Sequence, residues 1–530
     1  MGVMHNFKYK EKVNVDKFES GKYHYTMSTL SQSLLWFGNN VTQPGKFVKE
    51  EKQMKKLIAL LLALVMILSM TACGGSDGAA AVAPTAAPEA PAADAPAAEA
   101  PAAEASGKTV LNVWSFTDEV PNMIAKYLEL NPDFAEKYEI KTTIIATTDG
   151  LYQPALDQAL AAGGADAPDL YCAEAAFILK YAQGDAAKFA APYADLGIDI
   201  DADIKAADIA QYSVDIGTRP DDGKVVALGY QATGGAFIYR RSIAKDVFGT
   251  DDPAVIGEII GTGTGNWDKF YEAAATLKAK GYGIISGDGD LWHAVENSSD
   301  AGWIVDGKLN IDPKREAFLD LSKQLKDNGY HNDTQDWTDG WFADMKGEGA
   351  QGIFGFFGPA WLINYTLAPN CGGAAVGEGT YGDWAICAPP VGFFWGGTWL
   401  LANNDSQNKE AVGEIIHWIT LNCTEEGLQY MWANGTLNGE GGTKDCVASG
   451  TVMAMSNGEL DFLGGQNMFD VFVPANQYAN GKCLTQYDET INSYWRDQVR
   501  QYTAGEKTYE EAIAAFKQNV ADNLDVEVDF

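Results

Sequence analysis

The stretch VLNVW at residues 110–114 opens the part of the chain whose pattern decides the fold. It is a short apolar and β-branched run, and similar runs follow at residues 140–145, 169–172, 225–228 and 283–285. Segments with the apolar spacing of helices separate most of these runs. Alternating strands and helices predict an α/β fold. Because the roughly 420 residues that carry the pattern exceed the size at which single cores stop growing, we expect two domains.

Two later segments predict helices with defined ends. In residues 267–280 the apolar residues lie on one helical face, Asn266 is placed to cap the first turn, and Gly281 is placed to end the helix. Near the C-terminus, Thr508 and Glu511 form an S/T-x-x-E box ahead of an apolar stripe. The chain is therefore expected to end with a capped amphipathic helix.

The N-terminal region has the order of a bacterial lipoprotein export signal. Two lysines precede the apolar run at residues 57–70, and the small residues that follow it end at Cys73. The uninterrupted apolar part is shorter than the roughly 20 residues that a membrane-spanning helix needs. Charged, apolar and small-residue regions in this order are typical of a signal peptide. We therefore expect a signal peptide at residues 54–72 and a lipid anchor on Cys73.

The position of this signal within the chain is unusual. Export signals are N-terminal, so we expect translation to begin at Met54 and residues 1–53 to be a mis-assigned upstream extension. Lys-Glu-Glu at residues 49–51 fits a purine-rich ribosome-binding site in the gene. A genuine extension with a weak amphipathic segment near residues 30–37 is the alternative. Residues 73–107 are mostly Ala, Pro and acidic residues, which cannot bury apolar surface and so predict an extended tether.

The charge and cysteine content exclude several classes of partner. A net charge of -34 and a pI near 4.4 argue against nucleic acid, polyanions and charge-driven docking on anionic lipid. Six cysteines follow Cys73, which is compatible with disulfides in an oxidising exterior and equally with free buried thiols. There is no C-x-x-C pair and no Cys/His cluster, so we expect no metal and no cofactor.

The motifs of common enzymes are absent or incomplete. The glycines at residues 261–265 lack both the G-x-G-x-x-G spacing and the Lys-Ser/Thr of a phosphate loop. No G-x-S-x-G or H-E-x-x-H motif occurs. Asp288 and Asp290 are close enough in sequence to act as paired carboxylates in glycoside cleavage, although solvated loop aspartates are commoner. We expect no enzyme activity and keep a surface glycoside-active enzyme as an alternative.

Aromatic residues give the clearer functional signal. Thirteen of the 14 tryptophans follow the tether, and four of them stand in Gly-rich, loop-like contexts. These four are Trp292, Trp303, Trp361 and Trp395. An indole beside glycines at a strand end can present its ring to a ligand, with core packing as an equally common alternative. The apolar face of a pyranose packs on such rings, and Asp, Glu, Asn and Gln bind its hydroxyls. The pattern predicts a sugar site.

Seven short motifs occur in a fixed order between residue 108 and the C-terminus. They are VLNVWSF (110–116), APDLYC (167–172), GKVVALGYQ (223–231), GAFIYRR (235–241), NWDKF (266–270), GIFGFFGPAW (352–361) and GGTWLLA (396–402). In type and order they resemble the family 1 extracellular solute-binding proteins of carbohydrate ABC transporters, which include the maltodextrin-binding proteins. One departure is Gly229, where the family usually has proline.

This resemblance implies a two-lobed α/β fold of the periplasmic-binding-protein-like type II class, with three crossings between the lobes. Lobe 1 would comprise residues 108–230 and 357–402, and lobe 2 would comprise residues 231–356 and 403–530. A ligand held between the lobes would be enclosed by hinge bending.

The resemblance also implies a set of ligand-binding residues and partners. The residues are Phe116, Asp118, Glu174, Tyr230, Gln231, Asp290, Trp292, Trp361, Trp395 and Trp495. The chain would be a monomer that captures a carbohydrate, above all an oligosaccharide, at the outer face of the cytoplasmic membrane and passes it to an ABC permease. A non-sugar polar solute such as a peptide or a polyamine is the alternative ligand.

Overall fold

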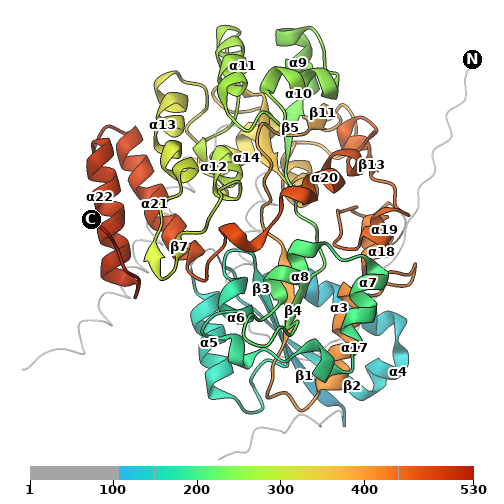
Figure 1. Cartoon of the computed structure of the whole chain (residues 1–530). Coiled ribbons are helices and arrows are strands. Elements are labelled where there is room, and N and C mark those ends of the chain that lie inside the picture. Colours follow the sequence, from blue (N-terminus) through green and yellow to red (C-terminus); the bar gives the residue numbers. More distant parts are fainter. Residues whose placement is uncertain (1–106, 148–149, 438, 440) are drawn as a thin grey trace, which may run out of the picture. The chain divides into compact units, whose positions relative to one another are not determined.

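The structure, a computed structural model, describes residues 107–147, 150–437, 439 and 441–530. The expected extension and signal peptide, and Cys73, lie outside the described residues. Within them, every helix is too short or too polar to cross a bilayer. The two largest sheets of the described chain, of five and three strands, are each accompanied by helices (Figure 1). This arrangement confirms the α/β class.

A five-stranded mixed sheet forms the centre of the first lobe, in the order β2-β1-β3-β12-β4. The strands are β1 (Thr109–Ser115), β2 (Tyr138–Ile144), β3 (Leu170–Glu174), β4 (Ala227–Gly229) and β12 (Thr398–Ala402). β1 runs parallel to β2 and β3, whereas β12 pairs antiparallel with β3 and β4. Four of the five apolar runs in the sequence therefore meet in this sheet.

Three amphipathic helices illustrate how the first lobe is covered. α3 (Glu119–Leu130) follows β1 and buries Met123 and Ile124, whereas α5 (Tyr152–Ala162) follows β2. α17 (Lys409–Thr420) packs on both α3 and β12. Figure 1 shows these helices grouped around the strands of the first sheet. The carboxyl ends of β1 and β3 are thereby left at one edge of the covered sheet.

A three-stranded antiparallel sheet forms the centre of the second lobe. Its middle strand is β5 (Ala236–Arg240), which pairs with β10 (Gly355–Gly358) and β11 (Trp384–Cys387). Helix α10 (Pro253–Ile260) packs on β11, and α12 (Asp288–Glu296) packs on β10. Apart from the last residue of β5, these strands are fully buried, which explains why they read as continuous apolar runs in the sequence.

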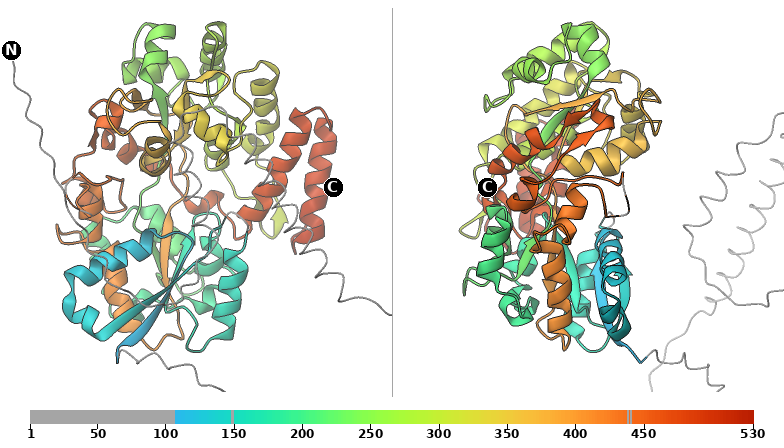
Figure 2. Two further views of the ribbon diagram at one scale, coloured as in Figure 1. Left: turned by 180° about the vertical axis from the view of Figure 1, so that it is seen from behind. Right: turned by 90° about the vertical axis from the view of Figure 1, so that its right-hand side faces the viewer.

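Both helices predicted from their ends are confirmed. The first is α11 (Asp268–Ala279), which buries the predicted apolar face; its N-cap is Trp267 rather than the predicted Asn266, whose Oδ1 accepts a hydrogen bond from Asp268 N at 3.1 Å. The second is α22 (Tyr509–Asn523), where Thr508 Oγ1 accepts a hydrogen bond from Glu511 N at 3.2 Å and Glu511 Oε2 accepts one from Thr508 N at 2.8 Å. Figures 1 and 2 show α22 beside α21 (Asp488–Thr503), against which it packs.

Two segments that connect the sheets run side by side. The chain leaves the first sheet through residues 230–235 and returns to it through the residues between β11 and β12. Gly235 N donates to Phe393 O at 2.9 Å, and Trp395 N donates to Thr233 O at 3.1 Å. A Cβ atom on Gly235 would lie 2.1 Å from the Phe393 ring, so only glycine fits at this close approach.

The strand pairing differs from the expected lobe boundaries in two places. Residues 357–402 are expected in lobe 1, but β11 belongs to the second sheet through its pairing with β5. Residues 403–530 are expected in lobe 2, but α17 packs on the first sheet. β5, the partner of β11, and α3, one of the partners of α17, lie far away in the sequence, and a local apolar pattern does not specify which distant strand or helix it will contact.

Candidate functional site

A cavity of 340 Å³ lies between the two lobes. The end of β3 lines it from the first lobe, α12 and α21 line it from the second, and the segment between β11 and β12 completes it. Its charged and aromatic lining includes Glu174, His293, Glu296, Trp395, Glu489 and Arg496. Glu174, Trp395 and Trp292 are the predicted ligand-binding residues that the structure brings to this cavity.

Glu174 is the last residue of β3, and its carboxylate reaches the cavity from the end of a buried strand. Its Oε2 atom accepts a hydrogen bond from Ala176 N at 2.7 Å. Burial, with smaller contributions from the carboxylates of Glu296 and Glu489, raises the pKa of Glu174 to about 7. Burial also raises the pKa of Glu296 and that of Glu489. Three acidic groups from three elements therefore share one partly desolvated space.

Trp395 is the centre of an aromatic cluster at the cavity. Its ring stacks on His293, with the ring centroids 3.5 Å apart and the planes 12° apart. Trp361 approaches Trp395 edge-on at 4.7 Å and donates a hydrogen bond from its Nε1 to Trp395 O at 3.1 Å. Trp337 lies nearly parallel to Trp361, at a centroid distance of 6.3 Å. These three indoles form a continuous aromatic surface.

Trp337 has an unusual backbone and exposure for a tryptophan. Its φ is 66°, which is in the left-handed region that residues with a large side chain rarely adopt, and its side chain is 51% exposed. Backbone strain of this kind persists where the surroundings impose it, and it is concentrated at functional sites. The ring contacts both Trp341 and Trp395.

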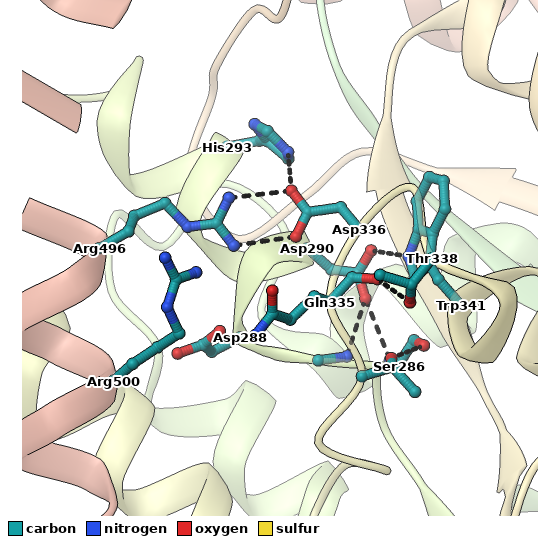
Figure 3. Close-up of polar contacts among 12 residues, drawn as sticks. Ser286, Asp288, Asp290, His293, Gln335, Asp336, Thr338, Trp341, Arg496 and Arg500 are labelled. Atoms are coloured by element: carbon teal, nitrogen blue, oxygen red, sulfur yellow. Dashed lines mark hydrogen bonds and ion pairs between the residues drawn. The ribbon is translucent and has the colours of Figure 1, made fainter. Parts of the chain in front are cut away.

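A buried ion pair fixes the loop that precedes Trp337 (Figure 3). The Arg496 guanidinium donates two hydrogen bonds to the Asp336 carboxylate, at 3.0 and 2.8 Å, and His293 Nε2 lies 3.3 Å from Asp336 Oδ2. Despite the burial of Asp336, the guanidinium and the imidazole hold its pKa well below the usual range. Asp336 of the Trp337 loop thus contacts Arg496 of α21 and His293 of α12. These contacts position His293 and Trp337 at the site.

Asp290 and Asp288 form hydrogen bonds within the second lobe and do not reach the cavity. Asp290 accepts hydrogen bonds from Trp341 Nε1 at 3.0 Å and from Gly287 N at 3.2 Å, and burial raises its pKa to about 8 (Figure 3). Asp288 accepts a hydrogen bond from Ser322. Neither carboxylate lines the 340 Å³ cavity. Asp290 therefore holds the first turn of α12 in place rather than contacting the cavity.

Two predicted residues that follow β1 also lie outside the cavity lining. Phe116 packs edge-on against Tyr152 and Phe177, at centroid distances of 5.8 and 6.0 Å. Asp118 is exposed at the N-terminus of α3, where its side chain makes no capping hydrogen bond. The partly buried ring of Phe116 belongs to an aromatic group of the first lobe.

Tyr230 and Gln231 lie in a second buried polar group, at the start of the segment that leaves the first sheet. The Tyr230 hydroxyl donates to the Glu119 carboxylate, and Gln231 Nε2 donates to Asp445 Oδ2 at 3.5 Å. Burial raises the pKa of Glu119 to about 7 and that of Asp445 to about 8. Neither Tyr230 nor Gln231 lines the 340 Å³ cavity.

The remaining predicted tryptophans in helices pack in the core of the second lobe. Trp495 is completely buried between Trp303 and Phe516, at centroid distances of 5.7 and 4.9 Å. The expectation that it stacks on a ligand is wrong, because its face of α21 packs against α22. Trp292 reaches the cavity but is only 1% exposed and packs on Phe318 at 4.9 Å.

Sequence reasoning did not select several residues that the structure places at the site. Glu489, Asn492, Arg496 and Arg500 line the cavity from one face of α21, at spacings of three and four residues. That polar stripe is visible in the sequence, but a polar stripe is usually a solvated helix face. Trp337 stands in an ordinary polar loop, and no local pattern distinguishes it from a surface residue.

Comparisons with known proteins agree with this architecture. Residues 114–422 match the sequence profile of the family described as bacterial extracellular solute-binding protein. Comparison with curated proteins gives no match. Among solved structures, a protein described as extracellular solute-binding protein family 1 is similar, with a TM-score of 0.62 and 17% identity. That match covers 78% of this chain and 99% of the other.

Two further structures come from named organisms. The galacto-N-biose-/lacto-N-biose I-binding protein of the ABC transporter from Bifidobacterium longum has a TM-score of 0.59 and 16% identity, over 80% of this chain and 99% of that one. An ABC substrate-binding protein from Listeria monocytogenes in complex with cycloalternan has a TM-score of 0.56 and 16% identity, over 78% and 99%. At these identities the likeness shows the fold alone.

The profile match and the fold lead to the same conclusion. The two-lobed type II α/β architecture predicted from the motif order is confirmed by the similar structures. The profile match extends from β1 to the segment that follows α17, more than half of the chain. The chain therefore belongs to the bacterial extracellular solute-binding proteins.

Proposed function

We propose that this protein binds a carbohydrate, above all an oligosaccharide, in the cavity between its lobes and delivers it to an ABC permease. The observation that carries the proposal is the position of Trp395, whose ring lines the cavity close to carboxylates from both lobes. An indole packs on the apolar face of a sugar, and carboxylates accept hydrogen bonds from its hydroxyls. The names of the two structures above, which concern lacto-N-biose and cycloalternan, support a sugar ligand.

The proposed ligand contacts come from both lobes. Trp395 and Trp361 would supply the stacking surface, with Trp337 as an additional ring at the edge of the cluster. Glu174 of the first lobe and Glu296 of the second would accept hydrogen bonds from the hydroxyls of the sugar. A ligand that contacts both lobes favours the conformation in which they are close together, because only differential affinity can shift such an equilibrium. We therefore expect ligand to reduce the radius of gyration, measured by small-angle scattering.

We further propose that the protein acts as a monomer tethered to the outer face of the cytoplasmic membrane by lipid on Cys73. The order of lysines, apolar run and small residues ahead of Cys73 supports this, as does the family's extracellular character. Replacing Cys73 with serine should release the protein from the membrane fraction. Mass spectrometry of the purified lipoprotein should find no peptide from residues 1–53, and any such peptide would show that the upstream extension is translated.

Calorimetric titration with a panel of mono- and oligosaccharides tests the ligand class. Trp395→Ala should weaken binding about tenfold to a hundredfold, the loss expected when a buried aromatic contact is removed. Trp267→Ala is the matched control, because Trp267 packs on Phe270 and Phe357 in the second lobe and does not line the cavity. It should leave the affinity unchanged.

The same assay separates the alternatives. If peptides or polyamines give a heat of binding and none of the sugars does, the ligand is a non-sugar solute and the carbohydrate proposal is wrong. The proposal includes no chemical step, so incubation with oligosaccharides should release no reducing ends. Release of reducing ends that Asp288→Asn or Asp290→Asn abolishes would instead identify a glycoside-active enzyme.

A further inference from the structure

We propose that the solute bound in this cavity carries a positively charged nitrogen, as an amino sugar or an oligosaccharide that contains one does. This inference rests on the proposed carbohydrate-binding function and narrows its ligand class. It starts from three carboxylates that line the cavity, Glu174 on β3, Glu296 on α12 and Glu489 on α21. They approach the same space from both lobes.

The hydrogen bonds of these carboxylates leave part of their capacity unused. Glu296 Oε1 accepts from Asn492 Nδ2, and Glu489 Oε2 accepts from Gln153 Nε2 of the first lobe. In the described part of the chain, no donor reaches the second oxygen of either group. No Lys or Arg nitrogen of the described residues lies within 4.0 Å of Glu174, Glu296 or Glu489. A ligand must therefore supply the missing donors and the missing positive charge.

The neighbouring cations already have anionic partners. The Arg496 guanidinium binds Asp336 through two hydrogen bonds, and Arg500 pairs with Asp497 at 2.8 Å. Lys180, which acts on Glu489 from a longer distance, pairs with Asp157 at 2.5 Å. These pairs leave the cavity with an excess of negative charge.

A second cation near Glu296 is also occupied. Arg315 acts on the Glu296 carboxylate, but its guanidinium donates to the backbone carbonyls of Ala301, Glu296 and Cys483. The buried carboxylate of Asp488 also lies close enough to be affected by the Arg315 charge. Arg315 therefore offsets only part of the Glu296 charge, and its hydrogen bonds go to other partners.

His293 adds a buried polar atom that has no partner. The residue lines the cavity and is 8% exposed, and its Nδ1 atom has no hydrogen-bond partner among the described residues. The ring lies against Trp395 at the cavity wall, with Nε2 3.3 Å from Asp336 Oδ2. An unpaired buried polar atom, independent of the carboxylates, marks this wall of the cavity as incomplete without a further partner.

An ammonium group satisfies this set better than a neutral hydroxyl does. A hydroxyl gives one donated hydrogen bond and leaves the mutual repulsion of the three carboxylates in place. An ammonium group gives three donors and also the opposite charge, which favours ionised carboxylates within about 4–6 Å. Burial raises the pKa of all three glutamates, and repulsion from Glu296 and Glu489 adds to the rise at Glu174, so their ionised forms are destabilised when no such cation is present.

Matched sugars test the inference. Glucosamine and galactosamine, and their β-1,4-linked disaccharides, would be titrated calorimetrically at pH 7 against the corresponding neutral and N-acetylated sugars. We expect at least one amine form to bind about tenfold to a hundredfold more tightly than its two counterparts, the ratio expected for charge-assisted hydrogen bonds. The preference should decrease with added salt.

Two variants assign the effect to the carboxylates. Glu296→Gln keeps the size of the side chain and should weaken binding of the amine sugar about tenfold more than binding of its neutral counterpart. Glu129→Gln is the control, because Glu129 lies exposed on α3 and pairs with Lys126. It should leave both affinities unchanged. Thermal unfolding of each variant would verify that the fold is retained.

The outcomes distinguish this inference from the function on which it rests. Equal or tighter binding of the neutral sugars would overturn the amine inference and leave carbohydrate binding intact. Binding of spermidine, without binding of any sugar, would overturn carbohydrate binding itself. An amine preference that persists unchanged in Glu296→Gln and in Glu489→Gln would show that these carboxylates do not create it.

Discussion

The Asp336–Arg496 ion pair should make a large, measurable contribution to stability. Both side chains are mostly buried, with 7% of Asp336 and 19% of Arg496 exposed, and the guanidinium donates both of its hydrogen bonds to one carboxylate. Removing one partner of such a pair leaves an uncompensated charge and costs about 3–5 kcal/mol. Since Arg496 retains some exposure, we expect Asp336→Asn to lower the free energy of unfolding by about 3 kcal/mol.

The expected thermal shift follows from the size of the folded part. Roughly 420 residues at about 2.1 cal/mol/K each give an unfolding entropy near 0.9 kcal/mol/K. A loss of about 3 kcal/mol therefore lowers Tm by about 3 °C, which scanning calorimetry resolves. The double variant Asp336→Asn, Arg496→Met should recover part of the loss, because it leaves no buried unpaired charge.

The pH dependence and a control complete this test. Because the pKa of Asp336 is depressed in the folded state, its stabilising effect is present above the unfolded value near 3.9 and is lost as the pH falls through the folded value. The gap between wild type and variant should therefore hold from pH 7 to about pH 4 and then close. Asp222→Asn removes a similar two-bond pair with Arg219 at the surface and should change Tm little. Equal shifts in Asp336→Asn and Asp222→Asn would refute the reasoning.

Three further changes probe the cavity and the crossing. Because burial raises the pKa of Glu174, the protonated side chain stabilises the fold below about pH 4.5, and this contribution is lost as the pH rises to about 7. In urea titrations over that range, the free energy of unfolding should therefore fall by about 1–3 kcal/mol less for Glu174→Gln than for wild type. Trp337→Gly should relieve the left-handed backbone, leave Tm unchanged or slightly higher, and weaken ligand binding about tenfold in calorimetry. Gly235→Ala should lower the free energy of unfolding by about 1–3 kcal/mol in urea, because its Cβ would overlap the Phe393 ring; an unchanged midpoint would contradict the tight crossing.

Local sequence signals predicted those parts of the fold that depend on neighbouring residues. The capped helix α22 follows from Thr508 and Glu511, which satisfy each other's backbone donors across one turn. The strand runs of the first sheet are likewise visible as apolar segments. The two-lobed fold was also predictable, because seven short motifs keep a family-like order along the chain.

The candidate site was only partly predictable. Glu174 and Trp395 lie where a strand end and a Gly-rich segment suggested, and both line the cavity. Trp495 has an equally suggestive context but packs in the core, because α22 covers its face of α21. The ring of Trp337 joins the cluster from a loop whose Asp336 contacts Arg496 of α21 and His293 of α12, two residues far away in the sequence.

The sequence by itself determined the α/β order, the capped start of the last helix and the family. Each of these depends on residues close together in the chain or on the order of short motifs. Only the tertiary structure decided that β11 joins the second sheet, that Trp495 is buried, and that carboxylates from β3, α12 and α21 share one cavity. The physical reason is that strand pairing, burial and charge proximity depend on contacts between distant segments, and a local pattern does not name its distant partner.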